Sequence, residues 1–317
     1  MISVVSGGVG AARFLRGLQS IIEPAEITAV VNTGDDVVMH GLSISPDIDT
    51  ITYTLAGAID PHRGWGLVDE SWVAMANLSR FAAVRPPGSH AGENWFNLGD
   101  RDLATHLYRT ARRAEGASLT DVTAEISAAW GLGVTILPMT DDRVETRVEV
   151  IGEGEVSFQV YFVGRQHSVP VSSVRFAGVD TATLSPGARR SLTDADVVVI
   201  APSNPLVSIG PIRALDGFDD LLISRRDSVV AISPIINGAA LKGPADRMLT
   251  ELGFESSAVG VARLYAPICS TIVIDRLDAH LAHTIESLGM RCIVTDTIMS
   301  TPEIAADLAR STLAAAA

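Results

Sequence analysis

The segment ISVVSGGVGAARFLRGL, residues 2–18, determines the fold class of this chain. Its first five residues, Ile-Ser-Val-Val-Ser, are typical of a short buried strand. Gly7, Gly8 and Gly10 then provide a tight turn, and the residues after them have the spacing of a helix. The first N–H groups of a helix that follows such a turn are free to bind phosphate. A strand, a glycine turn and a helix together predict the opening unit of an α/β fold.

This turn differs from the two best-known nucleotide-binding motifs. Arg13 occupies the third glycine position of the GxGxxG dinucleotide fingerprint, and no GK[ST] follows as in a Walker loop. Arg13 lies near the start of the predicted helix, where its guanidinium can contact an anion bound at that terminus. The alternative is a plain connection between a strand and a helix, without a ligand.

Further units of the same kind follow along the chain. Apolar runs at 27–31, 195–201 and 228–232 predict buried parallel strands, with shorter strands at 271–274 and 292–294. Such repeated units indicate a doubly wound, Rossmann-like and mainly parallel sheet. Two alternating segments, 144–151 and 156–163, predict an antiparallel pair. We interpret residues 1–317 as a single domain in which the mostly helical segment 65–132 forms an insertion over the sheet edge.

Polar residues follow several of these strands. The segment VNTGDDVVMHGLSISPDIDT, residues 31–50, contains Asp35, Asp36, Asp47 and Asp49 immediately after a buried strand. Ligands bind at the carboxyl ends of strands in open α/β sheets, and carboxylates there are natural ligands for Mg²⁺. The alternative is that Asp47 or Asp49 caps a helix and that the other two are solvated turn residues.

Ser203 and Asn204 follow the run at 195–201, and Ser233 and Asn237 follow the run at 228–232. Since parallel strands end at one edge of a sheet, we expect these residues, the glycine turn and the acidic segment to converge there.

Composition excludes several classes of protein. The chain has 317 residues, 47% of them hydrophobic, and a formal net charge of −13. This excess of acid argues against a nucleic-acid partner. No apolar run approaches the roughly 18 residues of a membrane span, and the N-terminus lacks the features of a signal peptide, so we expect a cytoplasmic protein. Cys269 and Cys292 are expected to be buried thiols.

The chain resembles a known family, the 2-phospho-L-lactate transferases (CofD/FbiA) of deazaflavin coenzyme F-420 biosynthesis, and within it the actinobacterial phosphoenolpyruvyl branch. The resemblance extends over nearly the whole chain. The motifs that carry it are SGGVGAARFL, VVNTGDD, SISPDIDT, DPHRGWG, LGDRDLATH, LPMTDDRVET, APSNPLVSIGPI and SPIINGAALKGPA. One departure is Ala11, where the family form has a further glycine.

The resemblance implies a phosphotransferase reaction that depends on Mg²⁺. The donor is a guanosine diphospho-acid carrying an enolpyruvyl or a lactyl unit, and the acceptor is Fo, 7,8-didemethyl-8-hydroxy-5-deazariboflavin. The ribityl hydroxyl of Fo attacks the phosphorus that bears the acid unit, GMP leaves, and (dehydro) F-420-0 forms. The sequence does not distinguish the two donors, although the actinobacterial branch favours enolpyruvyl. A homodimer is also implied.

The resemblance assigns roles to residues in three groups. For the donor phosphates and guanosine they are Gly7, Gly8, Gly10, Arg13, Ser203, Asn204, Ser233 and Asn237. For catalysis and the metal they are Asp47 and Asp49, with Asp35 and Asp36 as further metal ligands. For the acceptor Fo they are Asp49, Asn97, Arg101 and Trp65.

An alternative function comes from a different class. A CofD-like fold also occurs in a bacterial family that binds nucleotide-sugars and controls cell-wall growth. SPDIDT together with LGDRDLATH favours the transferase.

Overall fold

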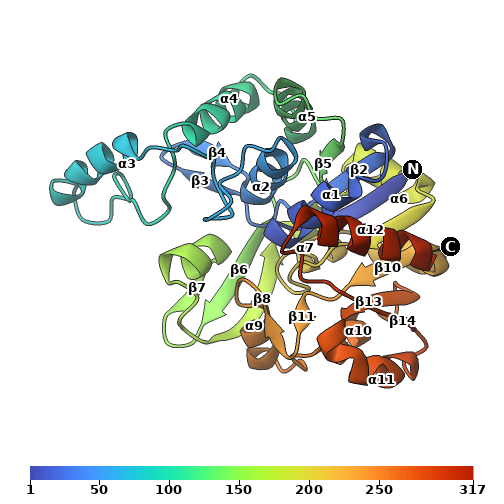
Figure 1. Cartoon of the computed structure of the whole chain (residues 1–317). Helices are drawn as coiled ribbons and strands as arrows, with labels where there is room; N and C mark the ends of the chain where they lie inside the picture. Colours follow the sequence, from blue (N-terminus) through green and yellow to red (C-terminus); the bar gives the residue numbers. More distant parts are fainter. Residues whose placement is uncertain (317) are drawn as a thin grey trace.

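A seven-stranded parallel sheet forms the centre of the protein, which we describe over residues 1–316 of a computed structural model (Figure 1). The strand order is β14-β13-β10-β9-β1-β2-β5. Its strands are β1 Ile2–Ser6, β2 Ile27–Val31, β5 Thr135–Pro138, β9 Val197–Ile200, β10 Val229–Ile232, β13 Thr271–Asp275 and β14 Arg291–Thr295. The prediction of a doubly wound parallel sheet is confirmed.

Twelve α-helices are present within residues 1–316. Their bounds are α1 Val9–Leu18, α2 Pro46–Leu55, α3 Val73–Leu78, α4 Asp102–Ala114, α5 Leu119–Ala129, α6 Pro186–Asp194, α7 Gly210–Arg213, α8 Phe218–Ser224, α9 Ala245–Glu251, α10 Ala258–Tyr265, α11 Ala282–Glu286 and α12 Pro302–Ala316. Short 3-10 turns are η1 Pro24–Glu26, η2 Ser79–Ala83, η4 Val179–Thr181, η5 Arg226–Ser228 and η6 Arg276–Leu281, and η3 Val160–Gly164 is a π-helical turn. None of these helices is both long and apolar enough to cross a bilayer.

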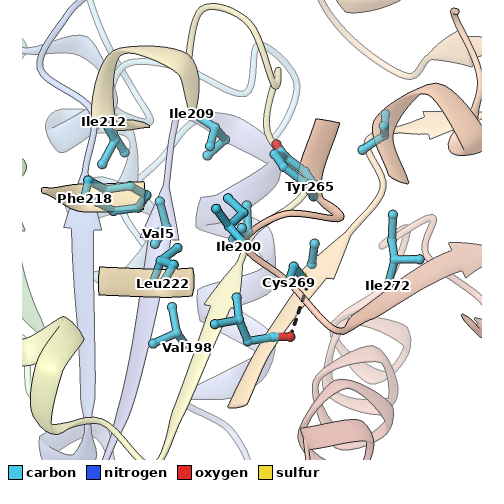
Figure 2. Close-up of a cluster of buried hydrophobic side chains, with 14 of the residues drawn as sticks. Val5, Val198, Ile200, Ile209, Ile212, Phe218, Leu222, Tyr265, Cys269 and Ile272 are labelled. Carbon is cyan, nitrogen blue, oxygen red and sulfur yellow. Dashed lines mark hydrogen bonds between the residues drawn. The ribbon is translucent and has the colours of Figure 1, made fainter. Parts of the chain in front are cut away.

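Alternate residues of each central strand enter two separate cores. On one face, Val5, Val198 and Ile200 pack with Phe218 of α8 and Tyr265 of α10 (Figure 2). On the other face, the side chains between them pack under α1, α2 and α12, and the last helix lies beside the first (Figure 1). Both faces are therefore covered, which explains why these strands are continuous apolar runs in the sequence.

Three small sheets lie outside the central one. β3 Val37–Met39 and β4 Leu42–Ile44 form a hairpin, as do β11 Ile235–Ile236 and β12 Ala239–Ala240. β6 Glu145–Val150 pairs with β7 Gly154–Ser157 and with β8 Val171–Ala177, all antiparallel. The prediction of a strand over 156–163 is wrong beyond Ser157, because the chain there turns into η3.

The segment predicted as an insertion contains α3, α4 and α5 and contributes no strand to the central sheet. Figure 1 shows α3 reaching out beyond the sheet at the left of the view.

The strand order reverses its direction between β1 and β9. From β1 the chain adds β2 and β5 on one side, and β9, β10, β13 and β14 on the other. The connections that leave β1 and β9 therefore diverge to opposite faces of the sheet. A crevice at such a switch point, outside the carboxyl ends of the strands, is the usual ligand site of this architecture.

Candidate functional site

A cavity of about 590 Å³ opens at this switch point. It receives residues that follow β1, β2, β9 and β10, together with residues from the 60–66 loop, the 95–97 segment and the 240–245 loop. Most of the residues assigned from the sequence line it. They are Gly8, Gly10, Arg13, Asp35, Asp47, Trp65, Asn97, Ser203, Asn204 and Ser233. The acidic segment and three strand ends that are far apart in sequence thus meet at one place.

The glycine turn is packed too tightly for side chains. A Cβ added to Gly10 would lie 2.1 Å from the carbonyl oxygen of Pro202, and one added to Gly8 would lie 2.6 Å from Oδ1 of Asp47. The N–H of Gly7 donates to Oγ of Ser203 at 3.1 Å, which joins the ends of β1 and β9. No side chain caps α1, so the N–H groups of its first turn remain available at the cavity.

Arg13 is the cation closest in sequence to this turn, and it lines the cavity. Within residues 1–316, no carboxylate lies within ion-pair distance of its guanidinium. An unpaired guanidinium beside a free helix N-terminus is suited to a phosphate group, which accepts two parallel hydrogen bonds.

Three carboxylates crowd together beside the turn. The side-chain amide of Asn32 donates to Oδ2 of Asp47 at 3.0 Å, and the hydroxyl of Ser45 donates to Asp36 at 2.7 Å. Among the residues described, Oδ1 of Asp35 and Oδ1 of Asp36 are buried without any hydrogen-bond partner. Buried polar atoms are normally satisfied, so these two oxygens point to a missing partner.

The electrostatics of this cluster favour a positive charge. Burial, and next the charge of Asp47, raises the pKa of Asp35 well above its usual range. Burial also raises the pKa of Asp36 to about 8 and that of Asp47 to about 6. Burial outweighs the charge of Arg109, which lowers the pKa of Asp36, so a further cation would stabilise these carboxylates, and an all-oxygen donor set suits a hard divalent ion. The donor chemistry therefore fits Mg²⁺, although among residues 1–316 only Asp49, Asp102 and His106 have ligand atoms mutually close enough to hold one ion.

Asp49 has a different environment. Its carboxylate is held by both terminal nitrogens of the Arg109 guanidinium, and it does not line the cavity. Nη1 of Arg109 also lies 3.3 Å from Nδ1 of His106, whose Nε2 lies 3.2 Å from Oδ2 of Asp102. Asp49, Asp102 and His106 could together hold a metal ion by their mutual spacing. The guanidinium of Arg109 already supplies positive charge there, which makes this group the poorer cation site.

Two more of the assigned residues lie away from the cavity lining. The guanidinium of Arg101 donates to the carbonyl of Val68 and its backbone N–H to Glu70, on the surface. The backbone N–H of Asn237 donates to Asp278 at 3.0 and 3.1 Å. Asp36 lies beside the cluster but lines a second, smaller cavity.

The sequence reasoning missed one wall of the cavity. Phe96, Phe158 and Phe162 line it beside Trp95, and the rings of Phe158 and Phe162 stack with centroids 5.5 Å apart. These two positions are four apart in FQVYF, a helical spacing that the strand interpretation concealed. Lys242 also lines the cavity, and the signal for it was that the sequence contains no other lysine.

Comparisons with known proteins agree with this architecture. Residues 2–301 match the model of the family described as 2-phospho-L-lactate transferase CofD. A phosphoenolpyruvate transferase of Kitasatospora aureofaciens is 40% identical over an alignment of 320 positions that covers 99% of this chain and 97% of that protein. The phosphoenolpyruvate transferase of Nocardia farcinica is 41% identical over 98% of this chain and 93% of its own length.

Comparison with solved structures shows a protein with a similar fold. A crystal structure of a UPF0052-family protein from Bacillus halodurans superposes with a TM-score of 0.61 over 98% of both chains. At 15% identity this likeness concerns the fold alone. The family match and the 40% identity over almost the full length go further: the chain belongs to the CofD family, the 2-phospho-L-lactate transferases.

Proposed function

We propose that this protein transfers the phosphoenolpyruvyl, or the 2-phospho-L-lactyl, group from a guanosine diphospho-acid to Fo. The observation that carries the proposal is the cavity at the switch point. It combines an uncapped helix N-terminus, an arginine without an ion-pair partner, buried carboxyl oxygens without hydrogen-bond partners and a wall of aromatic side chains. A diphosphate, a divalent cation and a flat heteroaromatic acceptor are the ligands that these features suit.

The donor occupies the side of the cavity formed by the glycine turn. Backbone N–H groups at the start of α1 and the guanidinium of Arg13 bind its diphosphate. Ser203, Asn204 and Ser233, at the ends of β9 and β10, border the nucleoside. Asn237 does not line the cavity, although its chain neighbour Ile236 does.

Asp35, Asp36 and Asp47 are the proposed Mg²⁺ ligands, and the ion would neutralise charge on the donor phosphates. The chain itself contributes proton transfer and positioning. Oδ1 of Asp47 lies against Gly8 at the cavity, where this carboxylate can accept a proton from a substrate hydroxyl. Asp47 therefore takes the proton of the attacking ribityl hydroxyl. Asp49 is a positioning residue, because it holds Arg109 under the cluster.

The reaction forms one bond and breaks one. The ribityl oxygen of Fo bonds to the phosphorus that carries the acid unit, and the bond from that phosphorus to the bridging oxygen of the diphosphate breaks. GMP leaves with that oxygen. The rings of Fo lie against Trp65, Trp95 and Phe162, with Asn97 beside them. Arg101 lies outside this contact surface and would bind Fo only after its bond to Val68 opens.

The decisive experiment is mass spectrometry of the product formed from Fo with each guanylylated donor in the presence of Mg²⁺. We expect stoichiometric GMP and a phosphodiester, with the enolpyruvyl donor used in preference. The variant Asp47→Asn serves as the matched control, because it keeps the shape of the side chain and removes the base. GMP release that does not require Fo would reject the transfer reaction. Equal turnover with both donors would contradict the expected preference for the enolpyruvyl donor.

The assembly and the compartment are part of the same proposal. We propose a single-domain protomer that forms a homodimer in the cytoplasm, as the family resemblance implies. Light scattering coupled to gel filtration measures the mass directly, and a mass near the 33.4 kDa of one chain would contradict the dimer.

A further inference from the structure

Lys242 is the only lysine of the chain, and all other Lys and Arg positions are arginine. It lies in the loop between β12 and α9, at the edge of the cavity. Its ammonium reaches across to the 60–66 loop, since a Cβ placed on Gly64 would lie 2.8 Å from Nζ. Gly64 has φ +73°, a conformation in which glycine is favoured, and the missing side chain leaves room for the ammonium.

A comparison of the charged groups that line the cavity shows that Lys242 forms no ion pair with a described residue. These groups are Arg13, Asp35, Asp47, Arg63 and Lys242. Arg63 is paired with Asp60 at 2.9 Å and lies over the rings of Trp65 and Trp72. Within residues 1–316, no carboxylate lies within 4.0 Å of Nζ of Lys242, and no hydrogen bond to it is present.

The surroundings of Lys242 are aromatic. Trp65 directly follows Gly64, and a Cβ on Gly243 would lie 3.8 Å from the ring of Phe162. Phe162 in turn stacks on Phe158. The cation thus lies at the aromatic wall, whereas Arg13 and the N-terminus of α1 form the phosphate end of the cavity. A single point charge in a cavity lined by aromatic side chains suits a flat ligand that carries a negative charge on its ring system.

We propose that Lys242 binds the ionised ring hydroxyl of a planar heteroaromatic acceptor and so stabilises the anionic form of that ring. This inference rests on the proposed function, in which Fo is the acceptor. Fo carries such a hydroxyl at position 8 of a conjugated ring system, and loss of its proton delocalises negative charge over the rings. Because Arg63 is already paired, Lys242 is the free cation of this wall among residues 1–316.

The absorbance of bound Fo reports whether its ring hydroxyl is ionised. The ring hydroxyl is titrated by absorbance for free Fo, and for Fo bound to the wild type, Lys242→Met and Lys242→Arg, all without donor. In the wild type we expect bound Fo to ionise at a lower pH than in Lys242→Met, by about one pH unit or a tenfold change in the ratio of anion to neutral form. Lys242→Arg keeps the charge and is expected to retain most of the shift.

The outcomes separate the inference from the proposed function. Wild-type protein that binds no Fo would overturn both. Wild-type protein that binds Fo but ionises it at the same pH as Lys242→Met would overturn the inference alone. So would a Lys242→Met variant with weakened donor binding and an unchanged Fo titration. Lys242 is exposed, so the variants are expected to melt like the wild type, which thermal denaturation checks.

A second measurement reports contact directly. Reductive methylation with ¹³C-formaldehyde labels one lysine and the N-terminal amine, which donates a hydrogen bond to the carboxylate of Asp196. The lysine signal, identified by its absence in Lys242→Met, is expected to move on addition of Fo. A lysine signal unaffected by saturating Fo would place the acceptor elsewhere and overturn the inference.

Discussion

Replacing Asp49 by asparagine tests whether this carboxylate supports the fold or meets the substrate. Asp49 is 5% exposed, and the Arg109 guanidinium that holds it is 1% exposed. The substitution keeps the shape of the side chain and removes its charge. Arg109 would then be left buried with neutral acceptors at these positions, namely the new amide oxygen, the carbonyl of Ser43 and Nδ1 of His106.

The magnitude follows from this burial. Removing one partner of a buried ion pair costs about 3–5 kcal/mol, because the other charge stays buried and uncompensated. In domains of about 150–250 residues, each kcal/mol lowers the melting temperature by about 2–4 °C, so we expect a decrease on the order of 10 °C. Activity is expected to fall as well, since Arg109 would no longer be fixed beneath the acidic cluster.

The assay is thermal and urea denaturation together with GMP release below the melting range. Asp47→Asn is the control, because its carboxyl lines the cavity and has a raised pKa, so its removal is expected to abolish turnover without loss of stability. Adding Arg109→Met to Asp49→Asn removes both charges and is expected to restore much of the lost stability. An Asp49→Asn variant that melts like the wild type but lacks turnover would refute the reasoning. It would indicate that Asp49 acts directly in catalysis.

Three further predictions concern the donor end, the cation and a buried thiol. Arg13→Ala is expected to weaken donor binding about tenfold or more and to leave Fo binding unchanged, as measured by calorimetry, since charge-assisted hydrogen bonds contribute about 1.5–3 kcal/mol; weakened Fo binding alone would contradict it. Mg²⁺ is expected to raise the melting temperature of the wild type and not that of a variant with Asp35 and Asp47 both changed to Asn; an equal rise in both would contradict it. Burial raises the pKa of the Cys269 thiol to about 12, so at pH 8 it stays neutral and iodoacetamide is expected to alkylate it only on unfolding, by peptide mapping; rapid alkylation of native protein would contradict the burial.

The parallel sheet could be predicted because its strands are buried on both faces. The predicted bounds 2–6 and 27–31 coincide with β1 and β2, since Gly7 after the first strand and the polar turn residues after the second mark the strand ends. β8, by contrast, has the sequence VSSVRFA and is largely exposed, so no clear alternation predicts it. Residues 158–163 alternate like a strand, yet they form a π-helical turn because their aromatic rings pack over the cavity.

The candidate site could be predicted only where a residue directly follows a strand. Ser203 and Ser233 meet at the cavity because neighbouring parallel strands end at the same edge. The pairing of Asp49 with Arg109 joins positions 60 residues apart through the packing of α4 against β4, which no local pattern encodes. The same is true of Lys242, whose position at the aromatic wall depends on two loops that meet in space.

The hydrogen bond between Gly7 and Ser203 also has a consequence for how the protein folds during synthesis. It lies at the end of the strand pair β1 and β9, in which Ile2 is opposite Val197. β1 is synthesised first and cannot pair with β9 until most of the chain has left the ribosome. Contacts between such distant segments form slowly, because closing a long loop is entropically unfavourable. β1 can meanwhile pair with β2, and a nascent chain arrested before residue 197 would expose the unpaired backbone N–H and C=O groups of β1 that β9 normally pairs with.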